Sequence, residues 1–184
     1  AEVAEIFNHE AKTFGIKGDV EFDYTDAQKR SRKVSEKIVG GVHYLMKKNK
    51  IKEINGLGSF KDAKTIEITD GDDKGMTVTF DDCIIATGAV VRTLPGIELS
   101  DNVVSYEEQI LNPEAPEKMI IVGGGAIGME FAYVLSNYGV DVTVIEYMDR
   151  VLPNEDKDVS KEIAKAYKKL GVKLLTGHAT TEVR

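Results

Sequence analysis

The sequence predicts an α/β protein in which a small antiparallel β-meander is followed by a parallel βαβ unit. Short β-branched segments alternate with longer segments of helical periodicity, and a glycine-rich turn joins one apolar segment to a helix-forming one. The chain has 184 residues, 42% of them hydrophobic, which is enough for one or two small domains with cores of their own. We therefore expect one or two small α/β domains.

The amino-terminal quarter predicts two helices. Apolar residues recur at helical spacing over residues 1–14, and Gly15 is a suitable stop. Residues 20–24 predict a short extended piece. Asp26 is a candidate N-cap for a long helix that continues to about Lys48. A basic cluster on this long helix is expected to be a solvated face.

The periodicity then changes to that of short strands. Residues 52–55, 65–69 and 76–80 predict an antiparallel meander, with a turn at residues 70–75 between its last two strands. Cys83 to Ala86 predicts a buried strand. Three of the four prolines lie within residues 92–118, so we expect an irregular segment that crosses between two domains.

The last third of the chain predicts alternating strands and helices. The expected elements in order are a strand at 119–122, a helix at 126–135, a strand at 141–145, a helix at about 156–170 and a strand at 172–175. Three strands of a parallel sheet are fewer than a doubly wound nucleotide-binding unit normally has, so this domain is expected to be incomplete.

The turn after the first of these strands has the G-x-G-x-x-G spacing, with glycines at 123, 125 and 128. The first glycine allows a tight strand-to-helix turn, the second lets a pyrophosphate approach the backbone, and the third lets the helix pack on the strand. The phosphates would then meet free N–H groups at the positive end of the helix dipole. A dinucleotide site is favoured over glycines that are only structural.

Glu146 is the candidate for the acid that binds the ribose. It ends the second predicted strand, 18 residues after Gly128, where about 20 are expected. A carboxylate accepts hydrogen bonds from free ribose hydroxyls and repels a 2′-phosphate, so NAD is favoured over NADP. Arg150 lies close by and is expected to be a solvated side chain.

Composition excludes several classes of function. The net charge of −7 and the pI near 5.1 argue against nucleic acid or an acidic membrane surface as a partner. No apolar run approaches the roughly 20 residues that span a bilayer. Cys83 is the single cysteine, so the 184 residues hold no internal disulfide and no metal site of several cysteines. We expect no metal, and a cytoplasmic location.

Two further segments carry a family resemblance. Residues 83–89 (CIIATGA) resemble the A-T-G segment of flavoproteins with two dinucleotide sites, and residues 55–60 (NGLGSF) resemble a segment near the adenine of FAD. With G-G-G-A-I-G-M-E at 123–130, the order of motifs is similar to that of the pyridine nucleotide–disulfide oxidoreductases over essentially the whole chain. Ile127 to Glu130 is most similar to members that oxidise protein-bound dihydrolipoamide with NAD⁺.

The resemblance implies the cofactors FAD and NAD and a role for particular residues. Residues implied to contact FAD are Gly58, Thr87, Gly88 and Ala89. Residues implied to hold the NAD pyrophosphate and the approach to the nicotinamide are Gly123, Gly124, Gly125, Ala126, Ile127, Gly128, Met129 and Glu130. Glu130 would lie near the flavin and nicotinamide rings, although a carboxylate near a helix N-terminus is also stabilised by the dipole alone. Glu146 would bind the adenosine ribose, and Thr180 would lie near the adenine.

The resemblance also implies domains and partners. Residues 1–116 would be part of an FAD-binding domain and 117–184 part of a Rossmann-like NAD-binding domain. The family's amino-terminal FAD motif, its C-x-x-x-x-C redox disulfide and its catalytic His-Glu pair find no match in these residues. We therefore assign no catalytic residue and expect an internal fragment that is inactive alone. The parent would be a homodimer that acts on the lipoyl domains of 2-oxo acid dehydrogenase complexes.

Three alternatives remain open from the sequence. The chain could belong to another member of the family, such as a transhydrogenase, a mercuric reductase or a thiol reductase. It could be a non-catalytic dinucleotide-binding module that senses redox state. It could also be a truncated domain with no ligand function.

Overall fold

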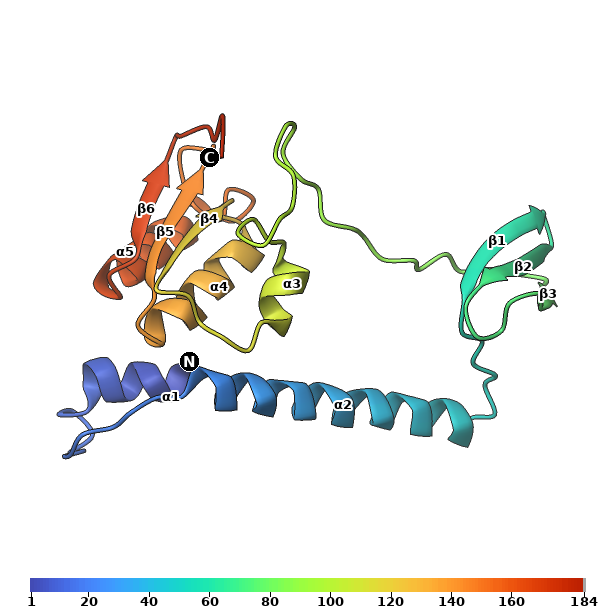
Figure 1. Cartoon of the computed structure of the whole chain (residues 1–184), viewed down its shortest axis with the longest axis horizontal. Coiled ribbons are helices and arrows are strands. Elements are labelled where there is room, and N and C mark those ends of the chain that lie inside the picture. The colour runs from blue at the N-terminus through green and yellow to red at the C-terminus, as the bar shows by residue number, and fades with distance from the viewer. Residues whose placement is uncertain (184) are drawn as a thin grey trace. The chain divides into compact units, whose positions relative to one another are not determined.

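The computed structural model divides the chain into two compact units, which are considered separately (Figure 1). One unit consists of Ala1–Ser31 with Val91–Arg184, and the other is Arg32–Val90. All residues but the last, 184, are described. No helix among residues 1–183 is both long and apolar enough to cross a membrane.

A parallel sheet organises the first unit. Its strands β4 (Lys118–Val122), β5 (Asp141–Glu146) and β6 (Lys173–Thr176) lie in the order β4-β5-β6. Helix α4 (Ala126–Asn137) connects the first two strands, and α5 (Lys157–Lys169) connects the last two. The sequence predicted each of these five elements to within two residues, and the predicted α/β class is confirmed.

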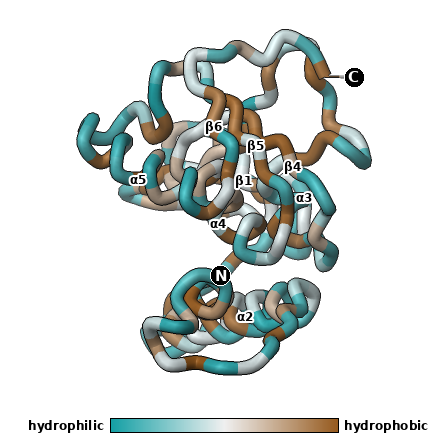
Figure 2. Tube along the Cα trace, turned by 90° about the vertical axis from the view of Figure 1, so that its left-hand side faces the viewer, coloured by the Kyte–Doolittle hydropathy of each residue, from teal (hydrophilic) through white to brown (hydrophobic). Residues whose placement is uncertain are grey.

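The core of this unit lies between the sheet and its helices. The β-branched residues of β5 alternate between half-buried and buried positions, and Val142 and Val144 point inward. Figure 2 shows the hydrophobic stretches of β5 and β6 in brown. The buried hydrophobic cluster comprises Met129, Ala132, Leu135, Val140, Val142, Val144, Val151 and Val172. Consecutive elements therefore supply a complete small core.

The amino-terminal helix docks on α4 within the same unit. It is shorter than predicted: α1 spans Glu2–Glu5, a π-helical turn η1 follows at Ile6–Glu10, and the chain leaves this helix at Gly15, where φ is +68°. The Tyr133 hydroxyl of α4 donates to Glu5 Oε2 at 2.6 Å. Partial burial and this hydrogen bond raise the pKa of Tyr133 to about 12.

The extended piece predicted at residues 20–24 forms no strand. Its Phe22 ring instead packs edge-on between Phe7 and Tyr138, with centroid separations of 6.0 and 6.3 Å. No strand among residues 1–183 lies beside this segment, so it cannot form a strand ladder. Aromatic packing holds it in place of strand pairing.

The segment predicted to be irregular contains one short helix, α3 (Tyr106–Leu111). Ser105 and Glu108 form a capping box at its start, a signal that the sequence analysis missed. At its end, the Gln28 amide donates to the carbonyls of Ile110 and Leu111 at 3.5 and 3.2 Å. Local capping and these contacts explain why the helix forms between prolines.

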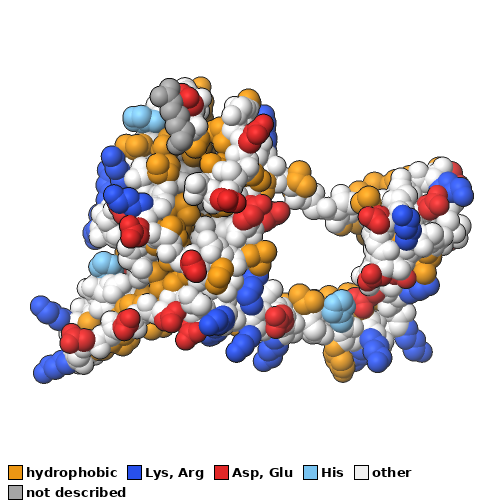
Figure 3. Space-filling model, viewed as in Figure 1, with side chains coloured by type: hydrophobic (Ala, Val, Ile, Leu, Met, Phe, Trp, Pro, Cys, Tyr) orange, Lys and Arg blue, Asp and Glu red, His pale blue; other side chains and the backbone are white. Residues whose placement is uncertain are grey.

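Helix α2 (Tyr24–Lys48) is the longest element, and it ends where the sequence predicted. The predicted N-cap, Asp26, is wrong: the Asp23 carboxylate accepts a hydrogen bond from the Asp26 backbone N–H at 3.0 Å. No α2 residue is buried, and apolar residues such as Ile38 and Leu45 remain exposed. Figure 3 shows blue lysine and arginine side chains along the helix.

The antiparallel meander consists of β1 (Leu57–Asp62), β2 (Thr65–Asp70) and β3 (Thr77–Thr79). The strand predicted at residues 52–55 is wrong, since pairing begins at Leu57 opposite Asp70. Before that point the Asn55 N–H donates to the Asp73 side chain at 2.7 Å. This backbone group is therefore bonded to the turn at residues 70–75 and not to a neighbouring strand. The other two strands and the turn between them are confirmed.

The buried strand predicted at Cys83–Ala86 is also wrong in this structure. Residues 81–90 have no regular secondary structure and all are exposed, with Ile84 92% exposed. A strand needs a partner for its N–H and C=O groups, and no strand among residues 1–183 pairs with this segment. High β-propensity is therefore not enough to form a strand when no partner strand is present.

Candidate dinucleotide-binding site

The candidate site lies at the carboxyl end of the parallel sheet, where β4 runs into α4. Gly123 takes up a φ of +110°, a left-handed conformation that favours glycine, and its N–H donates to the Ile145 carbonyl at 2.8 Å. The turn is thus tied to the end of the neighbouring strand, β5. Open α/β sheets bind ligands at this edge.

The remaining glycines of the motif differ in what surrounds them. A Cβ added to Gly128 would lie 2.1 Å from the Gly123 carbonyl oxygen, so only glycine lets α4 approach the turn this closely. A Cβ added to Gly125 would meet nothing within 4 Å. Gly128 therefore serves helix packing, while Gly125 leaves an open face where a ligand can approach the backbone.

The N-terminus of α4 is available to an anion. Gly125 is its N-cap and supplies no side-chain hydrogen bond, and Ala126 and Ile127 are exposed. The first N–H groups of a helix have no partners within the helix, and the helix dipole adds partial positive charge there. A pyrophosphate fits this combination of open backbone and unused donors.

Glu146 ends β5 beside the glycine turn. Its side chain is buried, and its two oxygens accept separate backbone hydrogen bonds: Oε2 from Gly124 at 2.6 Å and Oε1 from Met148 at 2.7 Å. Each carboxylate oxygen can accept more than one hydrogen bond, so this fixed carboxylate still has capacity for ribose hydroxyls. Its negative charge is held close to the turn.

Two residues that were not predicted from the sequence, Val151 and Leu152, support the turn from behind. The Leu152 N–H donates to the Gly124 carbonyl at 2.7 Å, and Leu152 has a φ of +48°. Val151 is almost fully buried, and a Cβ on Gly124 would lie 3.2 Å from its Cγ1 atom. No local pattern in the sequence indicates this contact, because it joins residues far apart in the chain.

The loop after β6 lies against the end of β5. The His178 N–H donates to the Glu146 carbonyl at 3.0 Å, and Gly177 donates to Met148 at 2.7 Å. Thr180 is half-buried, and its hydroxyl oxygen is buried with no hydrogen-bond partner among residues 1–183. An unpaired buried hydroxyl two residues beyond His178 is compatible with the predicted role of Thr180 near an adenine.

Two consecutive predicted residues on α4 have different surroundings. The Met129 side chain is buried in the core, and its carbonyl accepts a hydrogen bond from the Tyr167 hydroxyl at 2.8 Å. Glu130 is exposed, and burial together with the Glu130 charge raises the pKa of Tyr167. The roles of both residues toward a cofactor stay predictions.

The residues predicted to contact FAD lie in the other compact unit. Gly58 is in β1, where an added Cβ would lie 3.1 Å from Ile66 Cγ2. Thr87, Gly88 and Ala89 are exposed, and Gly88 has a φ of +76°. The structure thus gives a local reason for glycine at 58 and 88, and their cofactor roles stay predictions.

Other reactive side chains form no catalytic cluster in the described part of the chain. Cys83 is an exposed free thiol and not the buried one expected. His43 pairs with Glu53 at 2.7 Å, a partner that the sequence did not suggest, but both side chains are exposed. No group of three or more metal-binding side chains comes together among residues 1–183.

Parallel strands joined by a glycine turn, with an acid at the end of the second strand, are typical of the Rossmann fold. Residues 2–184 match the family model described as pyridine nucleotide-disulphide oxidoreductase, and the chain belongs to this family. The resemblance inferred from the motifs is therefore confirmed.

Curated relatives make the similarity more specific. The chain is 78% identical over all 184 residues to dihydrolipoyl dehydrogenase of Corynebacterium glutamicum, and 61% identical over 176 residues to that of Mycobacterium tuberculosis. The first match covers 100% of this chain and 39% of the relative, and the second covers 96% and 38%. The chain thus spans about two fifths of the length of these relatives.

Solved structures agree on the fold. The crystal structure of LpdA from Mycobacterium tuberculosis matches with a TM-score of 0.83 at 22% identity, covering 96% of this chain and 39% of that one. The HOCl-induced flavoprotein disulfide reductase RclA from Escherichia coli matches with a TM-score of 0.74 at 26% identity, covering 96% and 39%. Both likenesses extend over nearly the whole chain.

Proposed function

We propose that the protein to which these residues belong is a dihydrolipoyl dehydrogenase, which oxidises protein-bound dihydrolipoamide to the disulfide with NAD⁺ as acceptor. The observation that carries the proposal is the open N-terminus of α4 beside the buried carboxylate of Glu146. The high identity to curated enzymes of that name supports the substrate. Within this activity, the chain would supply the NAD site and part of the FAD site.

The residues divide between two cofactors. The backbone from Gly123 to Gly128 would hold the NAD pyrophosphate, Glu146 the adenosine ribose, and Thr180 would lie near the adenine. Gly58 and residues 87–89 would form part of the FAD wall. When bound, FAD would supply the redox chemistry between thiol and nicotinamide, while the protein orients both cofactors and excludes water.

Selectivity for NAD follows from the surroundings of Glu146. Two backbone N–H groups fix its carboxylate, so it cannot easily turn away from an incoming ribose. A 2′-phosphate at this point would face a buried negative charge, whereas the two hydroxyls of NAD would donate to it. We therefore expect a strong preference for NAD over NADP.

The wider assignments rest on the same relatives. We propose that residues 1–116 belong to an FAD-binding domain and 117–184 to an NAD-binding domain of a homodimer. Its partners would be the lipoyl domains of 2-oxo acid dehydrogenase complexes. The single cysteine and the acidic composition support work in the cytoplasm. These 184 residues cannot form a two-cysteine redox centre, so they would not turn over dihydrolipoamide alone.

The test is a turnover assay on the full-length protein. Dihydrolipoamide should reduce NAD⁺, and Glu146→Gln should weaken NAD⁺ binding about tenfold, because one charge-assisted acceptor contributes about 1.5 kcal/mol or more. Lys169→Gln, an exposed change on α5, is the matched control. Retained flavin absorbance and circular dichroism would show that the variants fold.

Two results would overturn the proposal. Turnover of a different disulfide or of mercuric ion, with none of dihydrolipoamide, would identify another member of the family. Tight NADH binding by a full-length protein that takes up no flavin would favour a redox-sensing module. A Glu146→Gln variant with unchanged affinity for NAD⁺ would remove the assigned role of Glu146.

A further inference from the structure

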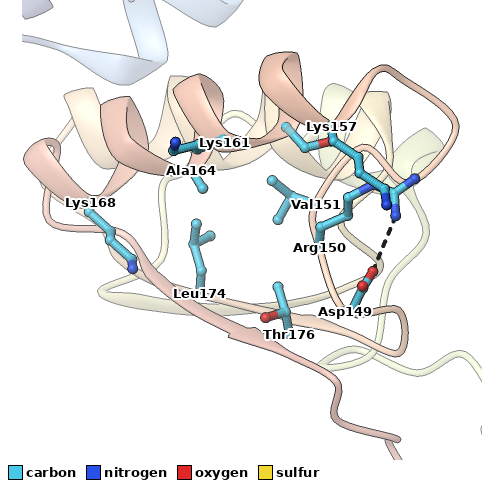
Figure 4. Close-up of a pocket in the computed structure, with 10 residues that line it drawn as sticks. Asp149, Arg150, Val151, Lys157, Lys161, Ala164, Lys168, Leu174 and Thr176 are labelled. Carbon is cyan, nitrogen blue, oxygen red and sulfur yellow. Dashed lines mark hydrogen bonds and ion pairs between the residues drawn. The ribbon is translucent and has the colours of Figure 1, made fainter.

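A second polar groove lies behind the loop that follows β5. It has a volume of about 190 Å³ and is bounded by that loop, the adjoining side of α5 and strand β6 (Figure 4). Its charged lining is Arg150, Lys157, Lys161, Lys168 and Asp149. Four cations thus share one groove with one carboxylate, on a chain whose net charge is −7.

The three lysines of the groove lie along one face of α5, with Lys157 and Lys161 one turn apart and Lys168 about two turns further on. Positions 157, 161 and 168 project from the same side of α5, within about 40° of one another at 100° per residue. No ion pair joins any of these lysines to an acid among residues 1–183, whereas Lys165, which does not line the groove, pairs with Glu162 at 3.4 Å. Uncompensated like charges repel, and a bound anion would remove that cost.

Arg150 adds a fixed guanidinium to the groove. One terminal nitrogen donates to the Pro153 carbonyl at 2.7 Å, and the other lies 3.3 Å from Asp149 Oδ1. Its Nε atom is buried without a hydrogen-bond partner among the described residues. A buried donor without an acceptor lowers the stability of the folded protein, and a bound acceptor would remove that loss. Arginine with several lysines is the donor set that recognises phosphate.

The groove is separate from the dinucleotide site. Val151 forms part of the groove lining, yet it also packs behind Gly124. Ser160, another lining residue, donates to the Leu152 carbonyl at 3.2 Å, and the Leu152 N–H in turn holds the Gly124 carbonyl. Residues 151 and 152 therefore lie between the groove and the glycine turn. Glu146 is not among the residues that line the groove.

We propose that this groove binds a phosphate-bearing small molecule at a site distinct from the NAD site. The ligand presents its phosphate to Arg150, Lys157, Lys161 and Lys168. The apolar side chains of Ala164 and Leu174 cover a short organic portion. The volume suits one phosphate group with a small substituent and excludes a whole dinucleotide.

The experiment uses the full-length protein with inorganic phosphate as the probe and NADH at saturation. Broadening of the phosphate ³¹P resonance is followed at constant ionic strength. We expect saturable binding that Lys161→Gln combined with Lys168→Gln weakens at least tenfold. Lys169→Gln combined with Lys165→Gln removes the same charge from α5 outside the groove and should leave the affinity within twofold.

Two outcomes would overturn the proposal. Equal losses in the two double variants would mean that phosphate responds only to the total charge of α5. Phosphate binding that is seen without NADH but disappears at saturating NADH would place the phosphate in the dinucleotide site. All four lysines are exposed, so the variants should fold, and circular dichroism checks this. The readout involves no turnover and is therefore independent of the proposed dehydrogenase activity.

Discussion

The parallel unit at residues 118–176 and the segment at residues 32–90 both carry apolar residues in their regular elements, but the two regions differ greatly in burial. In the first, eight apolar side chains form one buried cluster. In the second, Ile68 is the one buried hydrophobic residue, and Ile84 and Val90 are about 90% exposed. Each region is described alone, so this contrast concerns what each region can bury by itself.

The difference shows how topology decides burial. In the parallel unit, strands and helices alternate along the chain. Neighbouring elements therefore supply both the sheet side and the helix side of the core. Helix α2 has an apolar face and residues 83–86 have strand propensity, but the described part of the chain provides neither a covering layer nor a partner strand. Apolar pattern predicts which residues can be buried, and the rest of the fold decides whether they are.

The sharpest test of this contrast compares Leu135→Ala with Ile84→Ala in the 184-residue chain. Leu135 is fully buried on α4, so its truncation should lower the free energy of unfolding by about 2–5 kcal/mol. Ile84 is exposed, and its truncation should change stability by less than about 0.5 kcal/mol. Urea denaturation followed by circular dichroism measures both. A large loss at Ile84 would show that residues 81–90 pack in solution.

The next comparison separates packing from ligand approach within the glycine turn. Gly128→Ala places a Cβ 2.1 Å from a carbonyl oxygen and should cost about 1–3 kcal/mol of stability. Gly125→Ala meets no atom within 4 Å, so stability should change by less than about 1 kcal/mol, while NADH affinity of the full-length protein falls about tenfold. Equal stability losses in the two variants would contradict this division.

A smaller effect is expected where α2 begins. Asp23→Ala removes the acceptor for the Asp26 N–H and should destabilise the first turn by about 1 kcal/mol. Asp26→Ala removes only an exposed pair with Lys29 at 3.4 Å and should have less than half of that effect. Amide hydrogen exchange of residues 24–28 measures both variants, and the reverse order would restore Asp26 as the cap.

The smallest effect is expected at high pH, where α1 meets α4. The pKa of Tyr133 is about 12 in the folded protein and about 10 in an unfolded chain, so the folded state holds this proton longer. Its stabilising contribution is complete below pH 10 and is lost as the pH rises through about 12.

Tyr133→Phe removes this contribution. The difference in free energy of unfolding between the parent chain and the variant should therefore shrink between about pH 10 and pH 12. Tyrosinate absorbance provides the independent check. If Tyr133 ionises near pH 10, its hydrogen bond to Glu5 does not persist in solution.

The candidate site was predictable where local geometry demands particular residues. The spacing of Gly123, Gly125 and Gly128 followed from the needs of a tight turn and a close helix, and Glu146 followed from its place at the end of a strand. Asp23 and the pair Ser105–Glu108 carried capping signals that were readable but overlooked. The role of Leu152 was not predictable, because its hydrogen bond to Gly124 joins residues distant in sequence. Arg150 was expected to be solvated, but its Nε atom is buried and its guanidinium donates to Pro153 in the same loop.

By itself, the sequence determined the order of elements in the parallel unit, the glycine turn and the acid at the end of β5, because each reflects periodicity or backbone geometry within a few residues. The anchoring of Glu146 by two backbone donors, the packing of Val151 behind Gly124 and the lack of a partner strand for residues 83–86 are features of the tertiary structure. Hydrogen-bond partners and burial depend on neighbours brought together by folding, and no local pattern encodes them.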